Sequence, residues 1–186
     1  MVADLYGIVN VPTAVWIGEN GTVLRGPETP ASNERMAEMI GLGPTVYLDA
    51  LRDWAAKGAE SAYIPAPDDL RRRQQDLDPD DVLAATEFRL AQHLYLRGDR
   101  DAARRHFVEA LRLRPESWTY RRQMWANYEP ENNMNREWYR AAMSTGDVPY
   151  YPPVQLGDAP ADAAATAQKQ REIYEALFKP LMAPDD

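Results

Sequence analysis

The sequence contains no cysteine among its 186 residues. Without a thiol, the chain can form no disulfide, no thiolate metal site and no cysteine nucleophile, so it cannot catalyse thiol–disulfide exchange as it stands. Long apolar runs are also lacking: no stretch approaches the ~20 apolar residues that a membrane-spanning helix needs. The first residues have neither the basic region nor the apolar core of a signal peptide. We therefore expect a cytoplasmic protein without membrane association.

Positive charges are fewer than negative ones: the chain has 21 Lys and Arg residues and 29 Asp and Glu residues, which gives a formal net charge of −8. Proteins that bind phosphate backbones carry basic surfaces, so a nucleic-acid partner is not expected. The basic run Arg71–Arg73 has aspartates on both sides and is typical of a solvated helix face. Hydrophobic residues make up 45% of the chain, which is enough for a packed core and argues against disorder.

Histidine occurs only twice, at His93 and His106, and neither has acidic ligands at a metal-binding spacing. We interpret both as surface or packing residues. The sequence also contains no Gly-rich phosphate loop, no nucleophile elbow and no His-Glu zinc motif. We therefore expect no metal, no cofactor and no catalytic residue in this chain.

Two short apolar runs near the N-terminus predict a β-hairpin. Residues 14–17 form the first run and residues 22–25 the second. Asn20-Gly21 lies between them, and this dipeptide tolerates the positive φ of a tight turn. Pro12 stands just before the first strand, where a missing N–H group is acceptable.

This region resembles the C-terminal half of the TlpA/ResA-like thioredoxin family, in which a Gly-containing turn leads to Val-Pro-Thr, a strand, an Asn/Asp-Gly turn and a last strand. The matching residues are Gly7, Val11, Pro12, Thr13, Ile17, Asn20 and Gly21. The resemblance implies that Val11, Pro12 and Thr13 form a loop with a cis proline that faces redox cysteines in the family. The alternative is an ordinary trans proline that enters a strand. The family's cysteine-bearing βαβ unit has no counterpart in this sequence.

Without that unit, the first strand would expose an apolar edge, which invites pairing with another chain. The residues of this edge are Ala14, Val15, Trp16 and Ile17. We expect either that helices bury them or that they pair across a two-fold axis in a homodimer.

The remainder of the chain shows helical periodicity. We expect a short helix near residues 33–40, a helix over residues 46–57 that ends at Gly58 and covers the hairpin, and another short helix over residues 68–76. An extended segment over residues 146–160 includes Tyr150-Tyr151-Pro152-Pro153. It could be a docking motif, but packing on its own domain is the preferred interpretation. A last helix over residues 161–178 is expected to stop at Pro180.

The clearest pattern is a pair of amphipathic helices that begins at the cap Asp78-Pro79, turns at Gly98-Asp99 and ends at Leu113. It resembles one tetratricopeptide repeat of ~34 residues. A degenerate second pair is expected over Trp118–Tyr128 and Arg136–Met143. The resemblance implies a peptide-binding groove lined by Ala85, Phe88, Gln92, Tyr95 and Leu96. The alternative, which we prefer, is that neighbouring helices or a dimer mate cover these residues.

The sequence thus predicts a mainly α fold with a small β-hairpin: an incomplete thioredoxin-like segment (1–60), a tetratricopeptide-like helical domain (61–145), and an extended linker with a C-terminal helix (146–186). As a whole it resembles bacterial redoxins with a helical extension. The expected function is a non-catalytic interaction and oligomerisation module, as a homodimer and with a protein or peptide ligand. The alternative is that the chain is the C-terminal portion of a thiol–disulfide or peroxide-related redoxin. In that case the parent protein could be extracytoplasmic.

Overall fold

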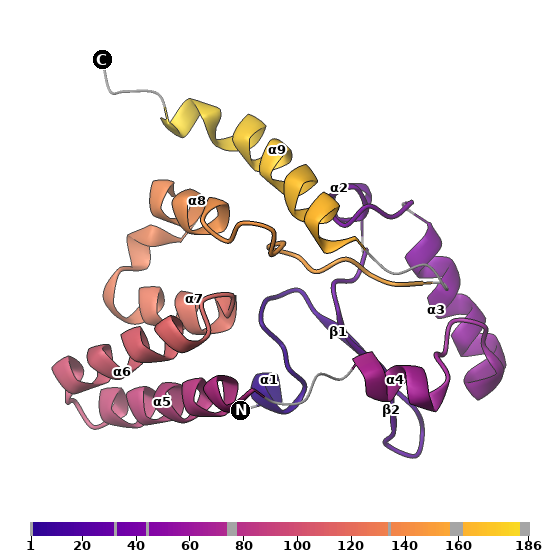
Figure 1. Ribbon diagram of the computed structural model, residues 1–186, viewed down its shortest axis with the longest axis horizontal. Coiled ribbons are helices and arrows are strands. Elements are labelled where there is room, and N and C mark those ends of the chain that lie inside the picture. The colour runs from indigo at the N-terminus through magenta and orange to yellow at the C-terminus, as the bar shows by residue number, and fades with distance from the viewer. Residues whose placement is uncertain are drawn as a thin grey trace. The chain divides into compact units, whose positions relative to one another are not determined.

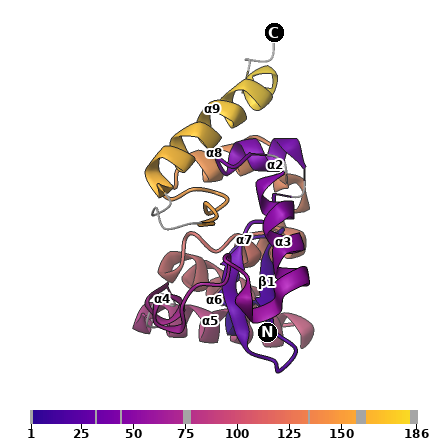
Figure 2. The ribbon, with the colours of Figure 1, turned by 90° about the vertical axis from the view of Figure 1, so that its right-hand side faces the viewer.

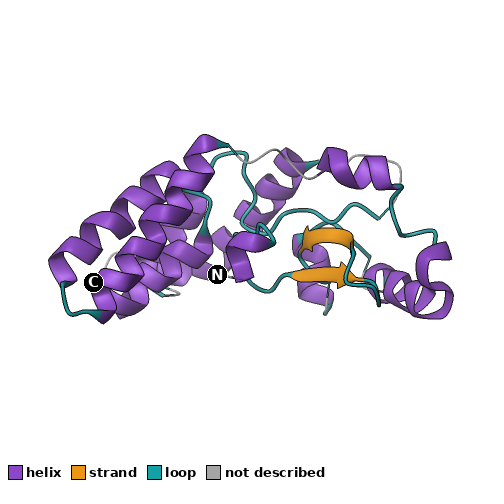
Figure 3. Ribbon diagram, turned by 90° about the horizontal axis from the view of Figure 1, so that it is seen from below, coloured by secondary structure: helices purple, strands orange, loops and turns teal. Residues whose placement is uncertain are grey.

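The computed structural model of the chain is mainly helical with one two-stranded antiparallel sheet, which confirms the predicted fold class (Figures 1 and 3). It describes residues 2–31, 33–43, 45–73, 78–133, 135–156 and 162–182. The chain divides into two compact units, the first formed by residues 1–11, 76–145 and 180–186 and the second by residues 12–75 and 146–179. Each unit combines segments that are distant in sequence, whereas the sequence-based division at residues 60 and 145 used contiguous ones.

The first unit is built on the pair of helices with the clearest sequence pattern. Its elements are α1 (Val2–Leu5), α5 (Pro79–Leu96), α6 (Arg100–Leu113), α7 (Trp118–Tyr128), the 3₁₀ turn η2 (Pro130–Asn132) and α8 (Arg136–Met143). Asp78 and Asp99 cap α5 and α6, because their side chains accept hydrogen bonds from the backbone N–H groups of Asp80 and Ala102. Gly98 makes the turn with φ of 87°, and the two helices lie antiparallel and side by side (Figure 1).

The core of the first unit is a set of aromatic rings between small residues. Phe88 of α5 stacks on Tyr120 of α7, with ring centroids 4.1 Å apart, and meets the edge of Phe107 of α6 at 5.5 Å. Buried alanines of α5 and α6 allow the helices to approach closely: Ala84, Ala91, Ala103 and Ala110. Helices α7 and α8 span the predicted residues. They pack together through Trp118 and Trp138, whose ring centroids are 6.0 Å apart.

The second unit contains the hairpin and the helices that cover it. Its elements are β1 (Ala14–Ile17), β2 (Val23–Glu28), α2 (Glu34–Met39), α3 (Val46–Lys57), the 3₁₀ turn η1 (Gly58–Glu60), α4 (Pro67–Arg73) and most of α9 (Ala163–Met182). The predicted turn is present: Gly21 has φ of 81°, and the Thr22 N–H group donates to Asn20 Oδ1 at 3.0 Å. Trp16 pairs with Arg25 and Ile17 with Val23.

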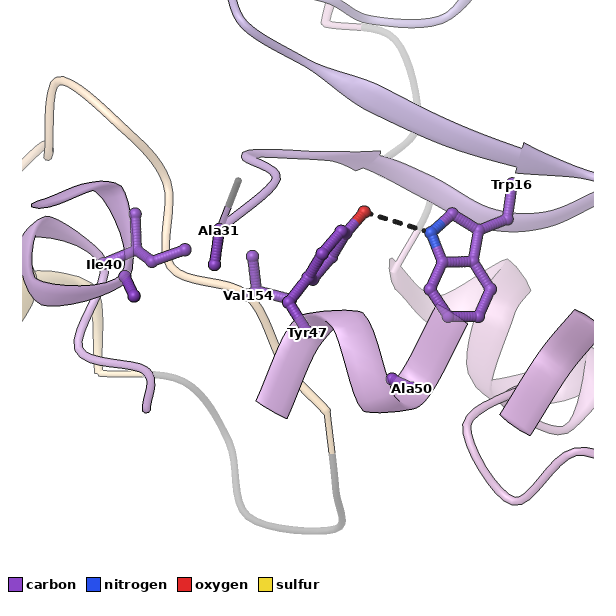
Figure 4. Packing of buried hydrophobic residues seen from close by; sticks show 7 residues of the cluster. Trp16, Ala31, Ile40, Tyr47, Ala50 and Val154 are labelled. Atoms are coloured by element: carbon purple, nitrogen blue, oxygen red, sulfur yellow. Dashed lines mark hydrogen bonds between the residues drawn. The ribbon is translucent and has the colours of Figure 1, made fainter. Parts of the chain in front are cut away.

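Helix α3 covers the hairpin, as predicted (Figure 2). The Trp16 ring stacks on Trp54 with centroids 4.8 Å apart and meets Tyr47 edge-on at 6.2 Å. Figure 4 shows Tyr47 between Trp16 on one side and Ala31, Ile40 and Val154 on the other, in a cluster that also contains Ala50. Val154 comes from the Pro-rich extended segment, so that segment packs within its own unit, in agreement with the preferred interpretation.

The Gln170 side chain of α9 fixes the extended segment and α2. Its Nε2 atom donates to the carbonyl oxygens of Tyr151 at 2.7 Å and Met39 at 3.0 Å, and its Oε1 atom accepts from the Tyr151 N–H group at 3.0 Å. The side chain is buried. One amide thus satisfies both backbone groups of Tyr151 in the extended segment and the carbonyl at the C-terminal end of α2. Such pairing is what permits an irregular segment to be buried.

Two element boundaries differ from the sequence-based prediction. Helix α9 continues through Pro180 to Met182, so the predicted stop at Pro180 is wrong; a proline near a helix end removes one hydrogen bond without disturbing the earlier turns. Strand β2 extends past Arg25 to Glu28 and includes Pro27, which an irregular strand tolerates. The predicted linker residues 157–160, the predicted helix start at Ala161 and residues 74–76 lie outside the described residues.

Replacing Gln170 with alanine should lower the free energy of unfolding by about 2–3 kcal/mol, because buried backbone groups would lose their partners. Gln168→Ala is the matched control: Gln168 lies on the same helix, is exposed and donates to Glu172 Oε1 at 3.3 Å on the helix surface. It should change stability by less than about 0.5 kcal/mol. Urea unfolding followed by circular dichroism measures both; equal effects would contradict the role given to Gln170.

Candidate interaction surfaces

The predicted Val-Pro-Thr loop lies where the two units meet along the chain, because Val11 belongs to the first unit and Pro12 to the second. Val11 and Pro12 are exposed, and Thr13 is half-buried. The loop is held on its N-terminal side by Asn10, which is buried and whose Oδ1 atom accepts a hydrogen bond from the Val11 N–H group at 2.9 Å. The cis geometry of Pro12 stays a prediction.

The residues of the predicted strand edge fall into two groups. Trp16 is buried against α3, whereas Ala14 and Val15 are half-buried and Ile17 keeps 41% of its surface exposed. Burial by helices, one of the two expected outcomes, therefore applies to Trp16. Among the described residues, the sheet has only the strands β1 and β2, so each strand has one side without a strand neighbour there.

A buried ion pair supports this hairpin from within. The Arg25 guanidinium donates from Nε to Glu28 Oε2 at 3.1 Å and from Nη2 to the same oxygen at 2.8 Å. Its remaining donors reach two backbone carbonyls, Tyr63 at 2.7 Å and Gln155 at 2.7 Å. Both side chains are almost completely buried. The guanidinium also lies 5.2 Å from the centroid of the Trp16 ring, which adds a cation–π contact.

Tyr47 joins the same network through its hydroxyl, which accepts a hydrogen bond from Trp16 Nε1 at 3.1 Å (Figure 4). Burial raises the pKa of Tyr47 to about 12; the Trp16 hydrogen bond works against this rise, and the Glu28 carboxylate adds to it. The phenol is thus held neutral, and the group is structural rather than a proton donor near neutral pH.

The five residues predicted to line a helical groove do not share one environment. Phe88 is fully buried under Tyr120, so it belongs to the core and offers no surface to a ligand. Tyr95 is half-buried between Tyr128, at 5.7 Å, and the guanidinium of Arg100, at 3.7 Å. The others are Ala85 and Gln92, which are half-buried, and Leu96, which is 85% exposed. The expectation that neighbouring helices cover these residues is therefore met for Phe88, while Leu96 faces solvent.

The chain's own N-terminal segment contacts the first helices of both pairs. Tyr120 of α7 donates its hydroxyl proton to Asp4 Oδ1 at 2.8 Å, and the Arg89 guanidinium of α5 lies 3.7 Å from Asp4 Oδ2. The Thr119 N–H group, in the first turn of α7, donates to the Val9 carbonyl at 3.0 Å. Burial raises the pKa of Tyr120, and the Asp4 carboxylate acts in the same direction.

Sequence reasoning missed both Arg25 and Asp4. For Arg25 a signal exists: an arginine inside an apolar strand, with an acidic residue close behind it at Glu28, is a pattern that favours a buried pair. For Asp4 no signal exists, because its partner Tyr120 is distant in the sequence and looks like an ordinary core residue.

No metal-binding group of three or more His, Cys, Asp or Glu side chains is present in the part of the chain that the structure describes. His106 Nδ1 lies 2.5 Å from Glu87 Oε2, which joins α6 to α5, and His93 is exposed. Across the described residues, none of the helices combines the length and the apolar character that spanning a bilayer requires.

Comparisons with protein-family models, with curated proteins and with solved structures give no significant match to this chain.

Replacing Arg25 with alanine should lower the free energy of unfolding by about 3–5 kcal/mol, because the Glu28 carboxylate would stay buried without its partner. Arg52→Ala is the matched control, since Arg52 is 71% exposed and pairs only at the surface with Asp49. That variant should lie within about 0.5 kcal/mol of the parent. Chemical denaturation of the three proteins measures these differences, and a mild effect at Arg25 would contradict the network.

Tyr47 should make stability fall at alkaline pH. Its folded-state pKa of about 12 lies above the ordinary value near 10, so its contribution is complete below pH 10 and is lost as the pH rises to 12. The parent should lose about 1–3 kcal/mol more stability over this range than Tyr47→Phe, which has no proton to release. Urea unfolding at several pH values tests this; parallel pH profiles for the two proteins would refute it.

Proposed function

We propose that this chain is a non-catalytic interaction and oligomerisation module that forms a homodimer through the edge of β1. The observation that supports the proposal most is the sheet itself. It has two strands among the described residues, and the apolar Ile17 side chain at the end of β1 is 41% exposed. An apolar strand without a neighbour is a template for pairing with another strand.

Rigid support of the hairpin also favours this use. Trp16 is anchored on α3 by ring stacking and by its hydrogen bond to Tyr47, while the opposite strand is anchored by Arg25. A strand that is already ordered loses little conformational entropy when it pairs. Two copies related by a two-fold axis would align β1 with β1 in antiparallel fashion, which closes the assembly at a dimer.

The second candidate is that this chain is the C-terminal portion of a thiol–disulfide or peroxide-related redoxin. The hairpin with its covering helix α3 favours it, since this is the arrangement that the resemblance to TlpA/ResA-like thioredoxins implies. The coding sequence immediately upstream tests this candidate. An in-frame Cys-x-x-Cys, or its selenocysteine equivalent, would support it, and an unrelated upstream sequence would contradict it.

The proposed compartment is the cytoplasm. The acidic composition, with a net charge of −8, is compatible with it. Fractionation of the producing cells, followed by immunodetection of the chain, would test this part of the proposal; recovery in an extracytoplasmic fraction would favour the redoxin parent instead.

Ile17→Lys should convert the dimer to a monomer, because a lysine on a strand edge opposes pairing with a second chain. Size-exclusion chromatography with light scattering should give twice the 21.1 kDa chain mass for the parent and 21.1 kDa for the variant.

Val108→Lys is the matched control for this experiment. Val108 lies on α6, in the other unit, and like Ile17 it is an exposed β-branched residue. Introducing the same charge there should leave the dimer intact. A monomeric parent would overturn the proposed dimer, and a dimer that survives Ile17→Lys would show that another surface forms it.

A further inference from the structure

We propose that Asn20 is a site of spontaneous covalent modification, at which the side-chain amide is converted to a carboxylate by way of a cyclic succinimide. Asn20 and Gly21 lie at the tip of the hairpin, and both are exposed. Asn20 is also the one asparagine in the sequence that a glycine follows. The reaction involves the chain alone, so the proposal is independent of the proposed dimer.

The reaction has two steps, and water is its co-reactant. In the first step, the Gly21 backbone nitrogen loses its proton to a base and attacks the Asn20 Cγ atom. The new N–C bond closes a five-membered ring, and the side-chain nitrogen takes up a proton and leaves as ammonia. In the second step, water adds to one of the two ring carbonyls and the C–N bond there breaks. One opening gives aspartate; the other carries the main chain through the side-chain carbon and gives isoaspartate.

The turn prepares the Asn20 carbonyl for this attack. The Thr22 N–H group donates to Asn20 Oδ1 at 3.0 Å, which holds the side-chain amide against the following backbone. As the nitrogen adds to Cγ, negative charge develops on Oδ1. A backbone N–H group already directed at that oxygen stabilises the charge without further rearrangement.

The attacking nitrogen is open to solvent. A β-carbon at Gly21 would meet no atom within 4 Å, so no neighbouring group shields this position from a base. The Gly21 N–H group donates to the Gly18 carbonyl at 2.9 Å, and this bond opposes removal of the proton. A single hydrogen bond in an exposed turn opens readily, however, so the reaction can proceed in the folded chain.

Two other asparagines serve as internal controls. Asn33 is exposed too, and its Oδ1 atom likewise accepts a backbone N–H group, from Met36 at 3.0 Å, but the side chain of Glu34 crowds the nitrogen that would attack. Asn10 is buried and precedes the β-branched Val11. Exposure and a polarised carbonyl are therefore matched at Asn33, and the following glycine is what distinguishes Asn20.

Incubation of the full chain at physiological temperature, followed by tryptic peptide mapping, tests the proposal. Asn10 and Asn20 fall in the peptide of residues 1–25 and Asn33 in that of residues 26–35, and fragment ions locate each conversion. Exchange of the amide for a carboxylate adds about 1 Da. Asn20 should convert at least about tenfold faster than Asn33, a difference of ~1.4 kcal/mol in the barrier. The rate should rise with pH, and two products of equal mass should separate by chromatography. Equal rates at Asn20 and Asn33 would overturn the proposal.

Gly21→Asn tests the role of the bare nitrogen. Asparagine tolerates the positive φ of 81° at this position, and there is room for its β-carbon. Its side chain should shield the nitrogen and slow conversion of Asn20 by about tenfold. Thr22→Ser is the matched control, because it keeps the backbone N–H group and should convert as the parent does. An unchanged rate in Gly21→Asn would contradict the mechanism.

Isoaspartate at this position should loosen the hairpin turn, because it adds a main-chain atom inside a closed loop. That loop is held by the Gly18 N–H group, which donates to the Thr22 carbonyl at 2.8 Å, and by the Gly21 N–H group. The aged forms carry an extra negative charge, so ion exchange separates them from the parent. Hydrogen exchange at the Gly18 and Gly21 amides should be faster in the isoaspartate form than in Asn20→Asp, which keeps the normal main chain. Equal exchange in the two proteins would refute this change in the turn.

Discussion

The second unit depends on one buried cation. Arg25 is surrounded by protein, so its guanidinium has given up its hydration, and that loss must be offset by partners in the fold. Glu28 supplies the opposite charge, while the carbonyls of Tyr63 and Gln155 take the remaining donors. These partners come from β2, from the loop before α4 and from the extended segment before α9. Three stretches of chain therefore have to be in place together for one side chain to be satisfied.

The aromatic contacts around this cation extend the same constraint to α3. The Trp16 ring contacts both the Arg25 guanidinium and the Trp54 ring, and its N–H group is satisfied by Tyr47. Buried polar networks of this kind favour one arrangement over close alternatives more than they add to total stability. That is useful for a hairpin, because two strands alone are marginally stable and can slip in register. The network fixes which face of β1 is buried. It makes no contact that covers the edge of the strand.

The first unit is held together in another way. Its centre is the ring contact of Phe88 with Phe107 and Tyr120, set among alanines that bring α5 and α6 close together. Non-polar packing tolerates a change at its rim better than a polar network does, because no partner is left unsatisfied in the core. The Tyr120 hydroxyl is the exception: it lies at the rim, needs an acceptor, and finds it in Asp4.

Local signals in the sequence were enough to predict most of the elements. Asp78 caps α5 as expected, Gly98-Asp99 forms the turn between the helices, Gly58 ends α3, and the Asn20-Gly21 turn forms the hairpin, because each depends on residues within a few positions of itself. The contacts that define the sites are of the other kind. Gln170 reaches Met39 across 131 positions and Tyr120 reaches Asp4 across 116. Periodicity carries no information about such pairs.

The groove prediction shows where this limit matters for function. The resemblance to a tetratricopeptide repeat placed Phe88 and Leu96 in one groove, yet α7 covers the first and leaves the second exposed, because cover is decided by the next helix pair and not by α5 itself. Of the five predicted groove residues, Leu96, which is 85% exposed, is the one whose side chain faces solvent along most of its surface.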